Sequence, residues 1–191
     1  MANPIAFLRR LSRRFRAGDF LRARSGATAV EFALVAAPLL FMLFSIIELA
    51  LVFMVSSSLE NATTEAARRI RTGATQGTTT TQQTAFRNTI CAEIGWMQAN
   101  CQANLSVDVW YYNSFAGQTL PPPTTGTTFN YANMRFNTGA PGDIVLVRSF
   151  YRWKLVSPFL KGGLERLSGG VTLLTAAATF RNEPFTAGGT P

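Results

Sequence analysis

Residues Phe32 to Val55 read FALVAAPLLFMLFSIIELALVFMV, and this stretch decides the fold. Its 24 residues include one ionisable side chain, Glu48. An α-helix rises about 1.5 Å per residue, so the stretch is roughly 36 Å long and can cross a hydrocarbon layer about 30 Å thick with some tilt. A buried core helix is the alternative, but core helices seldom stay apolar on every face for this length. The sequence therefore predicts a transmembrane helix over about residues 32–55.

A strongly basic arm precedes the apolar stretch. Seven arginines against one acid, Asp19, give the first 26 residues +6 of the formal +8: Arg9, Arg10, Arg13, Arg14, Arg16, Arg22 and Arg24. Basic flanks stay on the cytoplasmic side of a membrane, so everything after Val55 is predicted to lie outside. The arm also interleaves arginine with Phe and Leu, which suits anionic membrane lipids. A role in setting topology alone is equally compatible, whereas nucleic-acid binding is not expected because no folded reading surface accompanies the arm.

An ordinary secretory signal peptide is the runner-up for this N-terminal region. The apolar stretch is longer than the usual apolar core of about 7 to 15 residues, and no convincing small-x-small cleavage site follows it. Instead, helical spacing continues through Leu59, Ala62 and Ile70. One helix is thus predicted from about Thr28 to Arg71, crossing the membrane and continuing beyond it.

The rest of the chain has the pattern of a small external domain. Residues 72–84 are polar and threonine-rich, which indicates a linker, and the external domain is predicted over 85–191. Apolar residues at helical spacing predict a short helix over 84–98. Three strand-type runs follow, at 105–111, 144–153 and 171–180. The predicted fold class is α+β, in which a long N-terminal helix precedes a small antiparallel sheet packed on a short helix.

The chain contains two cysteines, Cys91 and Cys101. An external location permits their oxidation, so the sequence favours an intramolecular disulfide over two free thiols.

The junction between the basic arm and the apolar stretch reads RARSGATAVEFALVAAPLL. Gly26, four residues and then Glu31 and Phe32 resemble the processing site of Flp-type prepilins and TadE-like pseudopilins. The resemblance implies that a prepilin peptidase cuts after Gly26, which makes Ala27 the first residue and Glu31 the fifth. Family members commonly have Tyr after this Glu, and Phe32 keeps the aromatic ring while losing the hydroxyl.

The resemblance extends along most of the chain. FSIIELALVF followed by SLENATTEAARRIRTG is similar to the TadE signature, in which a late-helix Glu precedes an Asn-Ala and a Glu-Ala-Ala-Arg segment. TICAEIGWMQANCQANLSVDVWYY resembles its cysteine pair and following strand, and GDIVLVRSFYRWKLVSPFL and TFRNEPF resemble its C-terminal blocks. The chain is identified as a TadE-like or TadG-like member of the tight adherence (Tad) pilus system.

Two carboxylates interrupt or border the apolar stretch. A carboxylate inside an apolar run costs a few kcal/mol in the bilayer, so Glu31 is expected to have a partner or a polar surrounding. For Glu31 the resemblance implies pairing with the N-terminal amine of a neighbouring subunit, and snorkelling at the interface is the alternative. Glu48 lies roughly 25 Å further along the helix, toward the outer leaflet, where it could snorkel or contact a partner subunit in assembly.

Catalysis is not expected. The chain has no His, which excludes histidine-based acid–base chemistry and His metal sites, and two cysteines alone cannot form a structural zinc site. Phosphate-binding and dinucleotide-binding glycine motifs are absent from the sequence, and its external acids are scattered. No cofactor, metal or catalytic residue is predicted.

The resemblance implies a minor pseudopilin that acts as a structural subunit in pilus initiation or assembly. Its expected location is the bacterial inner membrane, with residues 1–26 cytoplasmic until removal and the C-terminal domain periplasmic. The expected partners are the prepilin peptidase, other minor pseudopilins, the Flp major pilin, the inner-membrane assembly platform and membrane lipids. The alternative is an unprocessed, single-pass anchored protein whose periplasmic domain serves as a binding or scaffold module.

Overall fold

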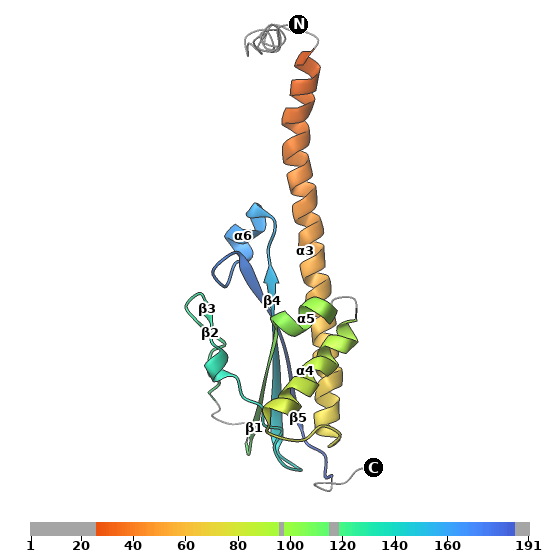
Figure 1. Cartoon of the computed structure of the whole chain (residues 1–191), viewed down its shortest axis with the longest axis vertical. Helices are drawn as coiled ribbons and strands as arrows, with labels where there is room; N and C mark the ends of the chain where they lie inside the picture. The colour runs from red at the N-terminus through yellow and green to blue at the C-terminus, as the bar shows by residue number, and fades with distance from the viewer. Residues whose placement is uncertain (1–25, 96–97, 115–118, 186–191) are drawn as a thin grey trace, which may run out of the picture. The chain divides into compact units, whose positions relative to one another are not determined.

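A computed structural model of the protein describes residues 26–95, 98–114 and 119–185 (Figure 1). The basic arm over residues 1–25 lies outside this described part. The chain divides into two compact units, residues 1–44 and 45–191, and each is described by itself.

Helix α3 spans Ala27–Arg71, in agreement with the helix predicted from about Thr28 to Arg71. It contains Pro38, and three arginines in its last turn complement the negative end of the helix dipole: Arg68, Arg69 and Arg71. Within the described ranges, α3 is one helix that is long and apolar enough to cross a membrane.

A three-stranded antiparallel sheet forms the centre of the second unit. Its strands are β1 (Leu105–Tyr112), β4 (Ile144–Lys154) and β5 (Val171–Arg181), in the order β1-β4-β5. Each strand lies within one or two residues of its predicted range because β-branched and aromatic residues alternate there with smaller or polar ones. The strand order was not predictable from the sequence.

Three short helices accompany the sheet: α4 (Thr80–Ile94), α5 (Gln98–Asn104) and α6 (Pro158–Leu164). Helix α4 begins four residues before the predicted start at Thr84. The reason is a capping box in which Thr79 accepts a hydrogen bond from the Gln82 amide and the Gln82 side chain accepts one from the Thr79 amide. The connection between α3 and α4 is therefore shorter than the predicted linker over residues 72–84.

The main core lies on one face of the sheet, between the sheet and the helices (Figure 1). The C-terminal part of α3 contributes fully buried side chains such as Leu59 and Ile70, and α4 contributes Phe86 and Ile90. The sheet meets them with alternate strand residues: Val107, Val109, Val147, Tyr151 and Ala176. The second compact unit thus begins inside α3, at Ser45.

The opposite face of the sheet is covered by the segment between β1 and β4. This segment forms the small hairpin of β2 (Thr124–Thr125) and β3 (Thr128–Phe129), followed by the 3-10 turn η2 (Tyr131–Asn133). Phe129 packs edge-on against Phe150 of β4, with ring centroids 5.8 Å apart, in a second cluster that also contains Leu167. The central strand β4 is thus buried on both faces along most of its length, whereas β5 leaves alternate residues such as Thr175 and Ala177 exposed.

A disulfide joins Cys91 of α4 to Cys101 of α5. Both cysteines are completely buried, and their Cα atoms lie 5.5 Å apart. The bond expected from the sequence is therefore present, and it fixes α5 to α4 just before β1 begins.

Candidate functional site

Gly26 is the first described residue and directly precedes α3. A Cβ atom built on it would meet nothing within 4 Å, and its φ lies outside the left-handed region. Glycine is usually required where φ is positive or the backbone approaches another group closely. Neither condition applies at Gly26, so the local conformation does not explain why glycine stands there.

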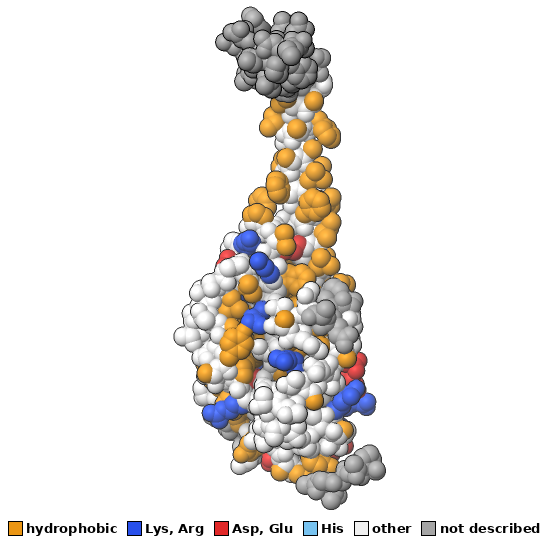
Figure 2. Space-filling model, in the orientation of Figure 1, with side chains coloured by type: hydrophobic (Ala, Val, Ile, Leu, Met, Phe, Trp, Pro, Cys, Tyr) orange, Lys and Arg blue, Asp and Glu red, His pale blue; other side chains and the backbone are white. Residues whose placement is uncertain are grey.

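The N-terminal half of α3 exposes many apolar side chains, some of which Figure 2 shows on the face in view. Phe32 is 74% exposed, and Glu31 is also exposed. The exposed set continues along the first unit with Leu34, Val35, Leu39, Leu40, Phe41, Met42, Leu43 and Phe44. A continuous apolar surface of this kind marks contact with lipid or with other proteins.

The structure gives Glu48 partners within its own chain. Its Oε1 accepts a hydrogen bond from the Val156 amide at 2.5 Å, and its Oε2 accepts one from the Ser157 amide at 2.7 Å. Both amides lie in the loop between β4 and α6, where Ser157 is the N-cap residue of α6. Hydrogen bonds to an ionised carboxylate are stronger than neutral ones, so this pair of bonds stabilises a largely buried charge.

A second contact joins the same loop to α3 one turn earlier. The hydroxyl oxygens of Ser45 and Ser157 lie 2.6 Å apart, within hydrogen-bonding distance. Residues 45 and 48 are three apart, so their side chains share one face of the helix. We call Ser45, Glu48, Val156 and Ser157 the helix-loop clamp.

The sequence analysis expected Glu48 to snorkel or to contact a partner subunit, and it did not find these partners within the chain. The one available signal was the Ser-Pro pair at 157–158, because a helix start offers backbone amides without acceptors. Glu31, Glu48 and the Cys91–Cys101 disulfide occupy three separate places in the chain, and the structure does not bring them together into one site.

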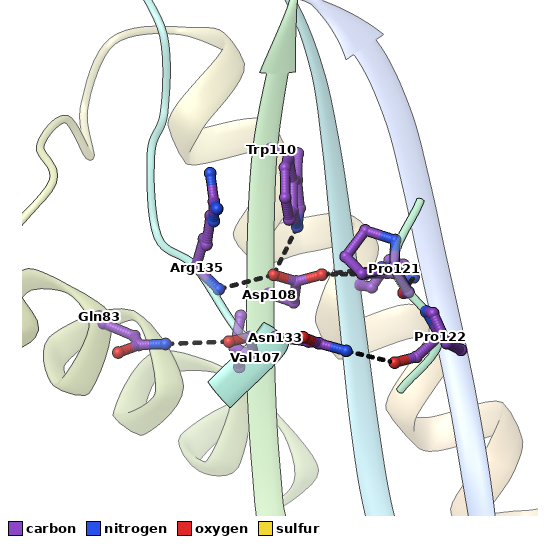
Figure 3. Close-up of polar contacts among 9 residues, drawn as sticks. Gln83, Val107, Asp108, Trp110, Pro121, Pro122, Asn133 and Arg135 are labelled. Carbon is purple, nitrogen blue, oxygen red and sulfur yellow. Dashed lines mark hydrogen bonds and ion pairs between the residues drawn. The ribbon is translucent and has the colours of Figure 1, made fainter. Parts of the chain in front are cut away.

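A second buried carboxylate, Asp108 on β1, lies on the face of the sheet opposite the main core (Figure 3). It is completely buried and pairs with Arg148, which stands opposite on β4 and donates from Nε to Oδ2 at 2.9 Å. Its Oδ1 accepts from the Trp110 indole at 2.7 Å and from the Arg135 amide at 2.8 Å. Arg148 also donates to the Pro121 carbonyl at 3.2 Å, so the network fixes the segment between β1 and β4 onto the sheet.

The hydrogen bonds of the Asp108 network hold parts of the fold together, and we assign no chemical reaction to this network. An open hollow lies beside it, lined by Trp110, Tyr112 and Arg135 among others. Burial raises the pKa of Tyr112, an effect that the nearby Arg148 charge partly offsets. Across residues 26–95, 98–114 and 119–185, no group of three Cys, Asp or Glu side chains is arranged to hold a metal ion.

These features define a class of protein: one candidate membrane helix with an exposed apolar surface, followed by a disulfide-bonded α+β domain whose core includes the end of that helix. Residues 26–68 match the family model of TadE-like proteins. The matched segment begins at Gly26 and contains both Glu31 and Glu48. The resemblance is therefore confirmed over this segment. No curated protein and no solved structure matches the chain.

Proposed function

We propose that the protein is a minor pseudopilin of a Tad/Flp pilus assembly and secretion apparatus, where it serves as a noncatalytic structural subunit in pilus initiation or assembly. One observation carries this proposal: the TadE-like match begins at Gly26, and α3 begins at the next residue. The proposed cleavage point thus coincides with the start of the helix that would enter the assembly. TadE-like proteins are structural pilus components, which supports the noncatalytic role.

Processing by a prepilin peptidase is the first step of the proposal. Cleavage after Gly26 removes the arm and its +6 charge and leaves Ala27 with a free α-amine at the first turn of α3. Among the described residues, a Cβ on Gly26 would meet nothing within 4 Å, so packing against them does not require glycine, and this supports a recognition role for Gly26. Phe32, 74% exposed, is available to the same peptidase or to a neighbouring helix.

Assembly through α3 is the second step. The exposed apolar half of α3 would pack against the helices of other minor pseudopilins and of the Flp major pilin, supported by the inner-membrane assembly platform. Within that bundle the Glu31 carboxylate would pair with the α-amine of a neighbouring subunit and neutralise both charges. Glu48 would act in assembly indirectly, because the helix-loop clamp fixes the folded domain to the same helix. The domain itself would be periplasmic.

The substitution Glu31→Gln tests the assembly step. It removes the charge but keeps the size, leaving the neighbour's amine without a counter-ion, which costs a few kcal/mol in an apolar bundle. We expect the variant to insert and to be cleaved at Gly26, but to lose piliation and co-purification with other pilin subunits. Glu60→Gln is the matched control, because Glu60 is an exposed acid on the same helix beyond the apolar stretch.

Three outcomes are distinguishable in this experiment. Normal piliation by Glu31→Gln would overturn the charge-pair mechanism. Loss of cleavage would assign Glu31 to recognition by the peptidase. Normal piliation in a strain that lacks the whole protein would overturn the proposed pilus function itself.

A further inference from the structure

The loop between β4 and α6, together with the first turn of α6, exposes two large apolar side chains. Val156 is 82% exposed and Phe159 is 72% exposed, although Leu155 beside them is buried in the main core. Two exposed lysines, Lys154 and Lys161, stand on either side of the pair. We call residues 154–161 the loop tip.

The helix-loop clamp fixes the height of the loop tip along α3. The Val156 and Ser157 amides both donate to the Glu48 carboxylate, so the loop tip lies level with residue 48 of the helix. Glu48 stands seven residues before Val55, where the apolar stretch ends, which is about 10 Å along the helix axis. The loop tip is therefore level with the apolar stretch of α3, not with the more polar part of the helix after Val55.

The number of helical residues needed to cross a membrane puts Glu48 and the loop tip close to the edge of the hydrocarbon layer. About 20 helical residues cross that layer. A span that starts at Phe32 ends at Leu51, beyond Glu48, and a span that starts at Ala27 ends at Ile46, two residues before Glu48. In both registers the loop tip comes within about 5 Å of the hydrocarbon edge.

We propose that the loop tip is a membrane-interface anchor. Val156 and Phe159 insert among the acyl chains of the leaflet that α3 leaves on its way to the folded domain. Lys154 and Lys161 reach the phosphates of the phospholipid headgroups. This inference rests on the proposed membrane insertion of α3, and it adds a second membrane contact to the folded domain.

Phospholipid fits the loop tip better than a neighbouring subunit does. Lysine is depleted at protein–protein interfaces, whereas its long apolar stem and charged end suit the boundary between acyl chains and headgroups. The exposed apolar surface also continues onto α3 at the same level, with Ile46 53% exposed and Ile47 48% exposed. The clamp satisfies the Glu48 carboxylate, which removes the main obstacle to placing this level of the helix against lipid.

Site-specific fluorescence measures this contact directly. The chain's two cysteines are joined in the disulfide, so a cysteine introduced at Phe159 is the one free thiol for an environment-sensitive dye. The full-length protein is placed at one copy per nanodisc of phosphatidylethanolamine and phosphatidylglycerol, and quenching by acyl-chain spin labels is compared with quenching by an aqueous agent. We expect acyl-chain quenching at Phe159→Cys to exceed that at Asn61→Cys several-fold. Asn61 is exposed on α3 about 20 Å beyond Glu48.

A label at Leu39→Cys separates failure of this inference from failure of the proposed function. Leu39 is 63% exposed in the N-terminal half of α3 and reports insertion of the helix itself. Lipid quenching at Leu39 with aqueous quenching at Phe159 would overturn the anchor and leave membrane insertion standing. Aqueous quenching at both positions would overturn membrane insertion as well. Shielding of Phe159 from both agents only in nanodiscs that hold several copies would replace lipid by a neighbouring subunit as the occupant.

Substitution of Glu48 tests whether the helix-loop clamp is what positions the loop tip at the membrane. Glu48→Ala removes both acceptors, so acyl-chain quenching at Phe159→Cys should fall several-fold while quenching at Leu39→Cys stays unchanged. Glu48→Gln retains one acceptor oxygen and should keep an intermediate value. Retention of the disulfide and of the circular-dichroism spectrum shows that each variant is folded. Full lipid contact in folded Glu48→Ala would overturn the positioning role of the clamp.

Discussion

At the scale of single residues, the two buried carboxylates follow one physical rule. Glu48 and Asp108 each accept hydrogen bonds from donors that the tertiary fold delivers. Buried charges are retained in proteins only where such partners compensate for lost hydration. The sequence indicated snorkelling or a partner subunit for Glu48, and it could not identify Val156 and Ser157, which are more than 100 positions away in the chain.

The Asp108 network predicts a large loss of stability when its acid is removed. Asp108→Ala leaves the Arg148 guanidinium buried without its counter-ion, and breaking such a pair typically costs about 3–5 kcal/mol. Denaturant unfolding of the full chain in detergent, followed by tryptophan fluorescence, measures the change. Glu60→Ala is the exposed control and should change stability little. A loss well below about 1 kcal/mol in Asp108→Ala would show that the pair is not desolvated as the structure indicates.

The burial of Tyr151 leads to a prediction about how the stability of the protein changes at alkaline pH. Burial raises the pKa of its phenol above the ordinary value near 10, and a hydrogen bond with Asn104 offsets part of this. The unfolded chain therefore loses the proton first, and stability should fall as pH rises from about 10 toward the folded pKa. Tyr151→Phe should flatten this part of the stability curve relative to the wild type. Equal slopes in the variant and the wild type would contradict the assignment.

At the scale of elements, the sequence predicted the helix and the strands that depend on a local pattern of apolar residues. The long apolar run predicted α3, and alternation of apolar residues predicted β1, β4 and β5 to within two residues. The predicted start of α4 at Thr84 was wrong. The capping box of Thr79 and Gln82 stabilises the helix start at Thr80, although the segment is polar and was expected to be a linker. The short helix α5 was not predicted, since a disulfide and packing against α4 support a segment too short to be helical alone.

The disulfide between α4 and α5 predicts a moderate stabilising effect. The Cys91–Cys101 loop is shorter than the 15-residue loop worth about 3 kcal/mol in the chain-entropy model, so the paired Cys91→Ala and Cys101→Ala replacement should cost roughly 2–3 kcal/mol. Unfolding of the full chain with and without reductant measures this. Reductant should lower the wild-type midpoint and leave the double variant unchanged. Insensitivity of the wild type would contradict a stabilising bond.

At the scale of the whole molecule, α3 serves two compact units. Its first part exposes apolar side chains, while the part after Ser45 supplies side chains to the core of the folded domain. The sequence analysis treated the helix and the external domain as separate, because helical periodicity alone does not reveal which face a distant sheet will cover. The structure instead makes the end of α3 part of the domain, so a subunit that joins a bundle through this helix carries its domain in a fixed relation to residues 45–71.

The central claim is that the protein is a processed pseudopilin, and the mature N-terminus tests it most directly. Intact-mass analysis and N-terminal sequencing of protein extracted from native membranes should show the loss of 26 residues and a first residue of Ala27. Gly26→Leu should block the cut. Gly163→Leu is the matched control, because a Cβ at that position also meets nothing within 4 Å, and it should be processed normally. Full-length protein alone, in cells with an active prepilin peptidase, would contradict processing and favour the permanently anchored binding or scaffold protein.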